Sequence, residues 1–200
     1  MLTGKRASLA ELIGSRICHD LISPIGAISN GVELISMGGD LNGPEIGLIA
    51  ESAENANARI RFFRIAFGAA PDGQMIGRQE ILSILRDVTR GGRTAIEWEP
   101  EGDLPRSGVK TAFLVLQCFE SAMPRGGHLS VRMLADNWAI SGQSDALNFV
   151  PELWAMLSDP QSTGPLSPAT VQFALAGLSA AEHGRDITLE TSPGLIRVRF

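Results

Sequence analysis

The strongest chemical signal in this chain of 200 residues is one histidine, His19. Apolar residues recur around it at alternating steps of four and three, which predicts the buried stripe of a helix formed by Leu21, Ile25, Ile28, Val32 and Ile35. At about 100° per residue, His19 lies roughly 120–180° from the first three members of this stripe. We therefore expect the imidazole to face water, where a partner protein can reach it.

The residues around His19 indicate which reaction it could perform. An acid, Asp20, follows the histidine directly and Pro24 lies five positions on, a pattern that resembles the phospho-acceptor box of sensor histidine kinases. The longer run RICHDLISPIGAI, residues 16–28, resembles the ChpT-type histidine phosphotransferases, and the resemblance extends over the whole chain. It implies an α+β fold, in which an antiparallel helical hairpin forms a dimeric four-helix bundle and a degenerate histidine-kinase ATPase-like domain follows.

The composition restricts the possible classes of protein. A hydrophobic fraction of 44% with 20% charged residues is typical of a soluble globular protein. The net charge of −5 argues against nucleic-acid binding, and we find neither an export signal nor a membrane-spanning run. Cys18 and Cys118 are the only cysteines, which disfavours a disulfide scaffold or a four-ligand metal site and favours the reducing cytoplasm.

Residues 1–70 are predicted to form the hairpin. The first helix is expected from Ser8, a candidate N-cap with Glu11 three positions later, to about Met37, and the second from about Pro44 to Gly68. The second helix carries a heptad seam of Ile46, Ile49, Ala53, Ala56, Ile60, Phe63 and Phe67. A lone hairpin cannot cover both apolar stripes, so we expect a homodimer with a four-helix bundle. The alternative is that the hairpin packs on its own C-terminal domain.

Residues 75–200 are predicted to form a second domain after a linker at 69–77. Helical and strand patterns alternate there and favour an α/β sandwich with antiparallel strands and helices on one face. The expected helices are 81–88, 111–123, 147–157 and 168–183, and the expected strands are 94–99, 128–135, 138–141, 187–190 and 195–200. Residues 121–131 and 181–194 resemble the two ends of the kinase ATP-binding domain.

The nucleotide-binding parts of that kinase domain are replaced in this chain. Ser121 and Gln117 stand where the kinases carry asparagines, one of which helps to hold magnesium. Asp145 lacks the glycines of the adenine-reading motif, and residues 176–178 are a poor remnant of the glycine box whose amides cradle phosphates. We therefore expect that ATP is not bound and that the chain has no cofactor or metal site of its own.

A histidine box without a nucleotide site favours phosphoryl transfer between proteins. By analogy with the kinases, Nε2 of His19 attacks the phosphoryl group, and Asp20 is the candidate that accepts the Nδ1 proton. Mg²⁺ would come from the partner receiver domain. The expected partners are the receiver of a hybrid histidine kinase and response regulators, and the resemblance implies regulators of the CtrA and CpdR kind. Alternatives are an atypical ATP-dependent histidine kinase and a non-catalytic dimeric adaptor that binds receivers.

Four further residues are candidate contacts for the phosphoryl group or the partner: Arg16, Ser23, Arg59 and Arg61. A hairpin turn near Asp40 and Leu41 would place His19 opposite Phe62 and bring the arginines of the second helix within reach. The alternative for each arginine is ordinary surface pairing with Glu51, Glu54 or Asp20.

Four further residues are expected to have structural roles, namely Pro24, Cys18, His128 and His183. Pro24 is expected to bend the helix just beyond His19, because it removes the hydrogen bond to the Asp20 carbonyl. Cys18 is expected to be a packing cysteine, and His128 and His183 to be structural.

Overall fold

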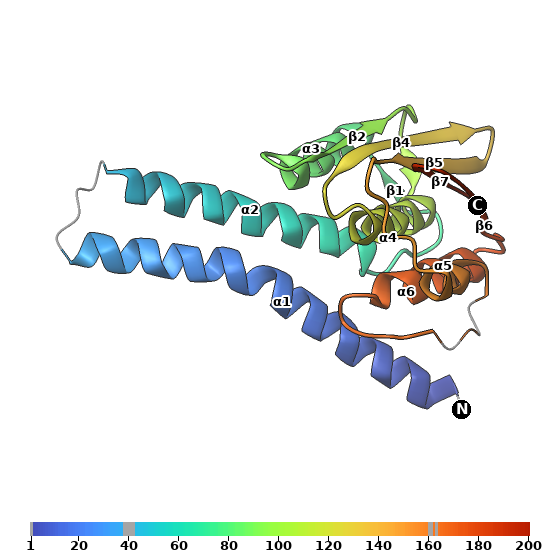
Figure 1. Ribbon diagram of the computed structural model, residues 1–200, viewed down its shortest axis with the longest axis horizontal. Helices are drawn as coiled ribbons and strands as arrows, with labels where there is room; N and C mark the ends of the chain where they lie inside the picture. Colours follow the sequence, from blue (N-terminus) through green and yellow to red (C-terminus); the bar gives the residue numbers. More distant parts are fainter. Residues whose placement is uncertain (1, 38–42, 160–161, 163) are drawn as a thin grey trace.

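The computed structural model describes residues 2–37, 43–159, 162 and 164–200, and for residues 2–8 it describes only the backbone. Among these residues, a hairpin of two long helices comes first, and a five-stranded sheet with four further helices follows. The hairpin projects from the rest of the molecule (Figure 1). No helix in the described ranges is both long and apolar enough to span a bilayer.

The two hairpin helices are α1 (Leu2–Ser36) and α2 (Pro44–Ala66). The predicted start of the first helix at Ser8 is wrong, because α1 already begins at Leu2. The predicted start of the second helix is confirmed: Pro44 occupies the first turn, where its missing N–H costs no helical bond. The expected turn residues Asp40 and Leu41 lie outside the described residues.

α1 and α2 approach each other closely beside Gly31. A Cβ atom at this glycine would lie 2.6 Å from Cγ1 of Ile49. The apolar stripe of α1 is only partly covered by α2, because Ile25 and Val32 remain 52% and 54% exposed. In the single chain the predicted stripe is therefore not buried along its whole length.

α1 bends along its length, so that its N-terminal part diverges from α2 (Figure 1). Pro24 lies inside this helix. A proline cannot donate the hydrogen bond to the carbonyl four residues before it, and its ring crowds that carbonyl. The predicted bend of α1 is therefore explained by Pro24, five positions after His19.

The C-terminal end of α2 is embedded in the core of the rest of the molecule. Ile65 and Ala66 are fully buried, and the Phe62 ring stacks on Phe113 with centroids 4.7 Å apart. This packing fixes the end of the hairpin on α4 (Arg106–Ala122). The orientation of α2, and with it the side chains that face α1, follows from that shared core.

The main sheet has the strand order β2-β4-β5-β7-β6. Its strands are β2 (Thr94–Trp98), β4 (Gly127–Leu134), β5 (Asn137–Gln143), β6 (Thr188–Ser192) and β7 (Leu195–Arg199). All neighbouring pairs are antiparallel except β2 and β4, which run parallel with Thr94 opposite Gly127. The prediction of antiparallel strands is therefore wrong for β2, which reaches β4 through the intervening α4.

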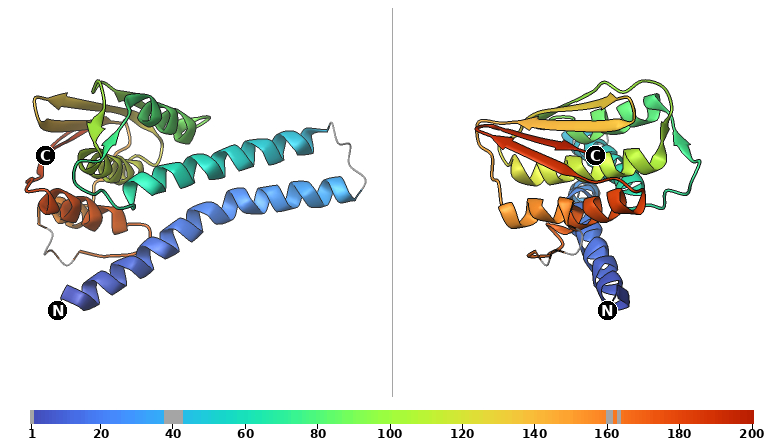
Figure 2. Two further views of the ribbon diagram at one scale, coloured as in Figure 1. Left: turned by 180° about the vertical axis from the view of Figure 1, so that it is seen from behind. Right: turned by 90° about the vertical axis from the view of Figure 1, so that its right-hand side faces the viewer.

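The helices form layers beside the sheet. α4 lies between the sheet on one side and α5 (Pro151–Ser158) with α6 (Val171–Glu182) on the other (Figure 2). α3 (Arg78–Thr89) precedes β2 and packs on α2. The predicted helices and strands of this region are all present, but α5 and α6 cover α4 rather than the sheet.

A second, two-stranded sheet joins the hairpin to this region. β1 (Met75–Ile76) pairs antiparallel with β3 (Leu104–Pro105). β1 lies inside the predicted linker, and β3 lies between the predicted strand 94–99 and the predicted helix 111–123. Arg106, directly after β3, donates to the carbonyl oxygens of Arg64 at 2.8 Å and Ala69 at 2.9 Å. These two hydrogen bonds of Arg106 hold the start of the predicted linker at the end of α2.

Candidate functional site

His19 stands on the outer face of α1, where its side chain is 85% exposed. This confirms the expectation that the imidazole faces water. Its Nδ1 lies 3.1 Å from Oδ1 of the adjacent Asp20. When Nδ1 carries the proton and donates to this carboxylate, the lone pair of the neutral ring is on Nε2.

Asp20 contacts His19 and two arginines, and only 10% of its side chain is exposed. One oxygen, Oδ1, faces His19, whereas Oδ2 accepts a hydrogen bond from Nε of Arg16 at 2.8 Å. Nη1 of Arg59, on α2, lies 3.7 Å from the same Oδ2. The two arginines compensate the carboxylate charge and leave the other oxygen free to orient the imidazole.

Arg16 connects this cluster to the C-terminal part of the chain. Its side chain is 14% exposed, and Nη1 donates to the carbonyl oxygen of Ala169 at 3.1 Å. Ala169 lies just before α6, 153 positions from Arg16. The arginine expected to contact a phosphoryl group is therefore engaged by groups of its own chain, as the surface-pairing alternative foresaw for Asp20.

Of the two candidate arginines on α2, Arg59 and Arg61, only Arg59 lies beside the histidine cluster. Its Nε donates to Oδ1 of Asn55 at 3.3 Å, and 36% of its side chain is exposed. Arg61 instead donates to Oδ2 of Asp87 at 3.0 Å and to Ser83 of α3. Arg61 therefore faces α3 and not the His19 cluster, because two positions along a helix turn a side chain by about 200°. Its contact with a partner protein stays a prediction.

The other residues near His19 are exposed. Ser23 lies on the same side of α1 and is open to solvent, as expected of a partner contact. Ile22, which no motif in the sequence marks, is 69% exposed and lies three positions from the histidine. The expectation of a packing role for Cys18 is wrong, because this cysteine is exposed.

The two remaining histidines have ordinary surroundings. Nε2 of His128 lies 3.4 Å from a carboxylate oxygen of Glu97 on the neighbouring strand. His183, at the end of α6, has Nδ1 2.8 Å from the carbonyl oxygen of Ser179. Both arrangements agree with the structural roles expected for these side chains.

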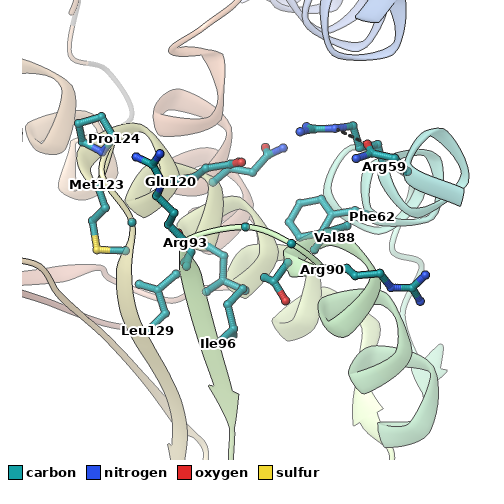
Figure 3. Close-up of a pocket in the computed structure, with 18 of the residues that line it drawn as sticks. Arg59, Phe62, Val88, Arg90, Arg93, Ile96, Glu120, Met123, Pro124 and Leu129 are labelled. Carbon is teal, nitrogen blue, oxygen red and sulfur yellow. Dashed lines mark hydrogen bonds between the residues drawn. The ribbon is translucent and has the colours of Figure 1, made fainter. Parts of the chain in front are cut away.

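A cleft of about 520 Å³ opens beside the histidine cluster and was not apparent in the sequence. Arg59 and Phe62 of α2 form one wall, and Arg93 and Ile96 lie toward β2 (Figure 3). The volume lies within the range of small-ligand pockets, roughly 300–1,000 Å³. Arg59 both lines this cleft and approaches Asp20, with Nη1 3.7 Å from Oδ2.

The face of α4 that carries Ser121 is covered by α6. Nε2 of Gln172, a fully buried residue, donates to Oγ of Ser121 at 2.8 Å and to the Ala169 carbonyl oxygen at 2.9 Å. Farther along, Oγ1 of Thr111 and Oγ of Ser179 lie 2.8 Å apart. A serine that already binds a buried amide does not fit a magnesium nucleotide.

The sequence identified His19, Asp20 and the arginines around them, but it missed Ala169 and Gln172. Both lie more than 140 positions away, and neither a backbone carbonyl nor a lone glutamine carries a motif. Their only sequence signal is indirect: Gln172 is a polar residue within the apolar pattern of the predicted helix 168–183.

Three comparisons with known proteins point to the same protein family. The model of the histidine phosphotransferase C-terminal domain matches residues 78–194. The chain is 35% identical over 190 residues to the protein phosphotransferase ChpT of Brucella abortus (strain 2308), covering 92% of this chain and 90% of that protein. A solved bacterial phosphotransferase superposes with a TM-score of 0.80 at 34% identity, over 96% of this chain and 95% of that one. The chain therefore belongs to the histidine phosphotransferase family that includes ChpT.

Proposed function

We propose that His19 carries a phosphoryl group between the receiver domain of a hybrid histidine kinase and downstream response regulators of the CtrA-like and CpdR-like kind. One observation carries this proposal: the His19 imidazole is 85% exposed while its Nδ1 faces the Asp20 carboxylate. A nucleophile that must meet aspartates on other proteins needs this combination of access and fixed orientation.

The transfer has two balanced halves. In the first, Nε2 of His19 attacks the phosphorus of an aspartyl phosphate, so that a P–N bond forms and the P–O bond to the donor carboxylate breaks. In the second, an acceptor carboxylate attacks, the P–N bond breaks and the imidazole is regenerated. Asp20 holds the Nδ1 proton throughout and stabilises the positive charge that the ring gains on phosphorylation.

The receiver would supply the metal for both halves. Mg²⁺ in the acidic pocket of a receiver neutralises charge on the phosphoryl oxygens during transfer. Residues of this chain would contribute through the exposed face of α1, where Ser23 and Ile22 flank the histidine. Arg59, 36% exposed, is the arginine best placed to meet the phosphoryl group or a receiver carboxylate.

The hairpin is proposed to dimerise into a four-helix bundle. Apolar side chains of α1 and α2 on the side away from His19 remain exposed in the single chain, namely Ile25 and Val32 of α1 and Ile46, Leu48 and Ile60 of α2. A second copy is the occupant that matches this surface, because a two-helix hairpin with stripes along both helices completes a bundle by pairing with itself. His19 lies away from the Ile25 and Val32 stripe, so dimerisation would leave it accessible.

The C-terminal part is proposed to be a degenerate kinase ATPase domain that does not bind ATP. The packing of Gln172 against Ser121 supports this proposal, because it covers the face of α4 that the nucleotide would need. The cytoplasm is the proposed location, and the exposed Cys18 thiol and the buried Cys118 thiol, both free, suit a reducing compartment.

A transfer assay tests the proposed function. A receiver carrying labelled phosphate is mixed with the wild-type protein, with His19→Ala and with His128→Ala, a control that removes a different, half-exposed histidine. We expect acid-labile label on the wild type and on His128→Ala, and none on His19→Ala. Label on His19→Ala would overturn the assignment of the acceptor.

Two further arms distinguish the alternative functions. Direct labelling of the wild type by ATP, with no receiver present, would identify an ATP-dependent kinase. A dimeric adaptor would pass no phosphate itself, so phosphate flow between two receivers would be the same with His19→Ala as with the wild type.

A further inference from the structure

We infer that the C-terminal domain positions the acceptor histidine, through Arg16 and the carbonyl of Ala169. This inference deepens the proposed function and rests on the role of His19 in it. Arg16 is thereby a positioning residue that ties Asp20 to the segment before α6, in place of the phosphoryl contact expected from the sequence. The C-terminal domain, which is proposed not to bind ATP, would then serve to position Asp20 and His19.

The bonds form a continuous chain with defined directions. Starting at the histidine, the Nδ1 proton points to Asp20 Oδ1, and Asp20 Oδ2 accepts from Arg16 Nε at 2.8 Å. Arg16 Nη1 then donates to the Ala169 carbonyl at 3.1 Å. Each donor has its own acceptor, so no link competes with the next.

The far end of this chain is anchored in the core. The Ala169 carbonyl also accepts from Nε2 of Gln172, whose side chain is fully buried. The same Nε2 donates to Ser121 Oγ on α4, and Ser121 donates to the carbonyl of Gln117 one turn earlier. The position of Ala169 is therefore set by α4 and α6, which form the centre of the C-terminal domain.

An arginine suits this link and a lysine does not. The planar guanidinium presents Nε and Nη1 in a fixed fork, so it binds the carboxylate and the carbonyl at the same time. With 14% exposure, the guanidinium is largely shielded from water, which strengthens both bonds. Arg59 cannot replace it, because its nitrogen lies 3.7 Å from Asp20, beyond a hydrogen bond.

The expected consequence concerns the tautomer of His19. An exposed imidazole is free to exchange its proton between two nitrogens and to change rotamer. A carboxylate held in one place by Arg16 favours the Nδ1–H form and leaves Nε2 as the nucleophile. Without the tether, the Asp20 carboxylate loses its fixed orientation, and the population of that form falls.

The test measures the tautomer directly by ¹⁵N NMR of histidine-labelled full-length protein at a pH where His19 is neutral. Arg16→Met and Gln172→Met remove the two ends of the tether with side chains of similar length. Ser179→Ala is the matched control, because it removes a buried hydrogen bond between the same two helices, α4 and α6, outside the tether. His183, bonded to a carbonyl at Nδ1, serves as an internal reference.

We expect the Nδ1–H fraction of His19 to fall in both methionine variants and to stay at the wild-type value in Ser179→Ala. Arg16→Lys should restore it only in part, since an ammonium on one nitrogen keeps the Asp20 pair but not the bridge. In the transfer assay the methionine variants should be slower by about tenfold, since misplacement of reacting groups costs up to about a hundredfold.

Three results would overturn the inference. The first is an unchanged tautomer fraction in both methionine variants, and the second is an equal change in Ser179→Ala, which would indicate general loosening. The third is a change in Arg16→Met alone, which would show that the Asp20 pair acts without the C-terminal domain. Failure of the proposed function is seen separately, as label on His19→Ala, and leaves the NMR result intact.

Discussion

Asp20 gives its two carboxylate oxygens different tasks, and the helix makes this possible. Arg16 lies four positions before Asp20, a spacing that puts both side chains on one face of α1. His19 lies one position away, yet its Nδ1 comes within 3.1 Å of the other oxygen. One turn of helix therefore holds the proposed nucleophile, the carboxylate proposed to orient it and the guanidinium that binds this carboxylate.

Replacing Asp20 by asparagine tests the value of its charge. Asp20→Asn keeps the shape of the side chain but can no longer balance the charge on the phosphorylated ring. We expect transfer from a phosphorylated receiver to slow by about a hundredfold, the lower end of the range for a positioned acid or base. The rate of loss of aspartyl phosphate from the receiver measures this effect.

Asp87→Asn is the control for that variant, because Asp87 pairs with Arg61 and Arg90 on the surface of α3, away from His19. It should transfer at the wild-type rate. Equal rates for Asp20→Asn and the wild type would show that the contact with Nδ1 has no part in transfer.

The two thiols differ sharply in their expected reactivity. Burial raises the pKa of the Cys118 thiol well above its ordinary value of 9.0, whereas Cys18 is exposed. At pH 8 we expect a maleimide to modify the native protein once, at Cys18, and a second time only after unfolding. Mass spectrometry of wild type and Cys18→Ser measures the two events, and rapid labelling of native Cys18→Ser would contradict the burial of Cys118.

The same pKa shift predicts the sign of a pH effect on stability. A thiol whose pKa is raised by folding is fully neutral in the native state below the ordinary value, so it causes no loss there. Above pH 9 the unfolded chain gains charge at Cys118 while the folded one does not, and the free energy of unfolding falls as pH rises. Cys118→Ala should flatten this part of the stability profile.

At the scale of elements, the hairpin depends on one close approach between its helices. A Cβ at Gly31 would meet Cγ1 of Ile49 at 2.6 Å, whereas a Cβ at Gly14 meets nothing within 4 Å. We expect Gly31→Leu to lower the free energy of unfolding by about 1–3 kcal/mol, the usual cost of overpacking. Gly14→Leu should raise it by roughly 0.5–1 kcal/mol, because glycine is a poor residue inside a helix.

Urea denaturation followed by circular dichroism measures both glycine variants against the wild type. The two substitutions add the same side chain to the same helix, so they differ only in what the side chain meets. Equal shifts of the same sign would mean that α1 and α2 do not pack at Gly31.

Most helices and strands could be predicted from the sequence, because the repeat of apolar residues extends over several turns or residue pairs in each. Ile46, Ile49 and the rest of the α2 seam repeat over several turns, and Pro44 marks the start of that helix. β1 and β3 have two residues each, too few to show any period, and they were missed. The parallel pairing of β2 with β4 was missed because strand direction depends on the path of the chain and not on the pattern within a strand.

In the candidate site too, some residues could be related from the sequence and others could not. His19, Asp20 and Arg16 lie within one turn and a half of α1, so helix geometry relates them from the sequence alone. The choice between Arg59 and Arg61 depended on the rotation of α2, which the stacking of Phe62 on Phe113 sets. Ala169 and Gln172 could not be placed, because only the tertiary fold brings the start of α6 to α1.

At the scale of the whole molecule, the base of the hairpin and the C-terminal domain share one hydrophobic core, while the far part of the hairpin projects freely (Figure 1). Phe62, Ile65 and Ala66 belong to that core, so the base of the hairpin is already stabilised within one chain. Its projecting part has no such support, and Ile25 and Val32 stay half exposed there. A second copy would bury them.

Removing this apolar surface tests the proposed dimer. In Ile25→Lys/Val32→Lys, two charges replace apolar side chains that are 52% and 54% exposed in one chain, and a two-fold interface would bring in four such changes. Each buried aliphatic side chain contributes roughly 1.5–3 kcal/mol, so the double variant should be monomeric at concentrations where the wild type is dimeric. Sedimentation equilibrium measures the mass of each.

Leu134→Lys, a change of the same kind at a 67% exposed leucine at the end of β4, should remain dimeric, since that residue lies far from the hairpin. A wild-type protein that sediments as a monomer, or a double variant that stays dimeric, would place the interface elsewhere or remove it.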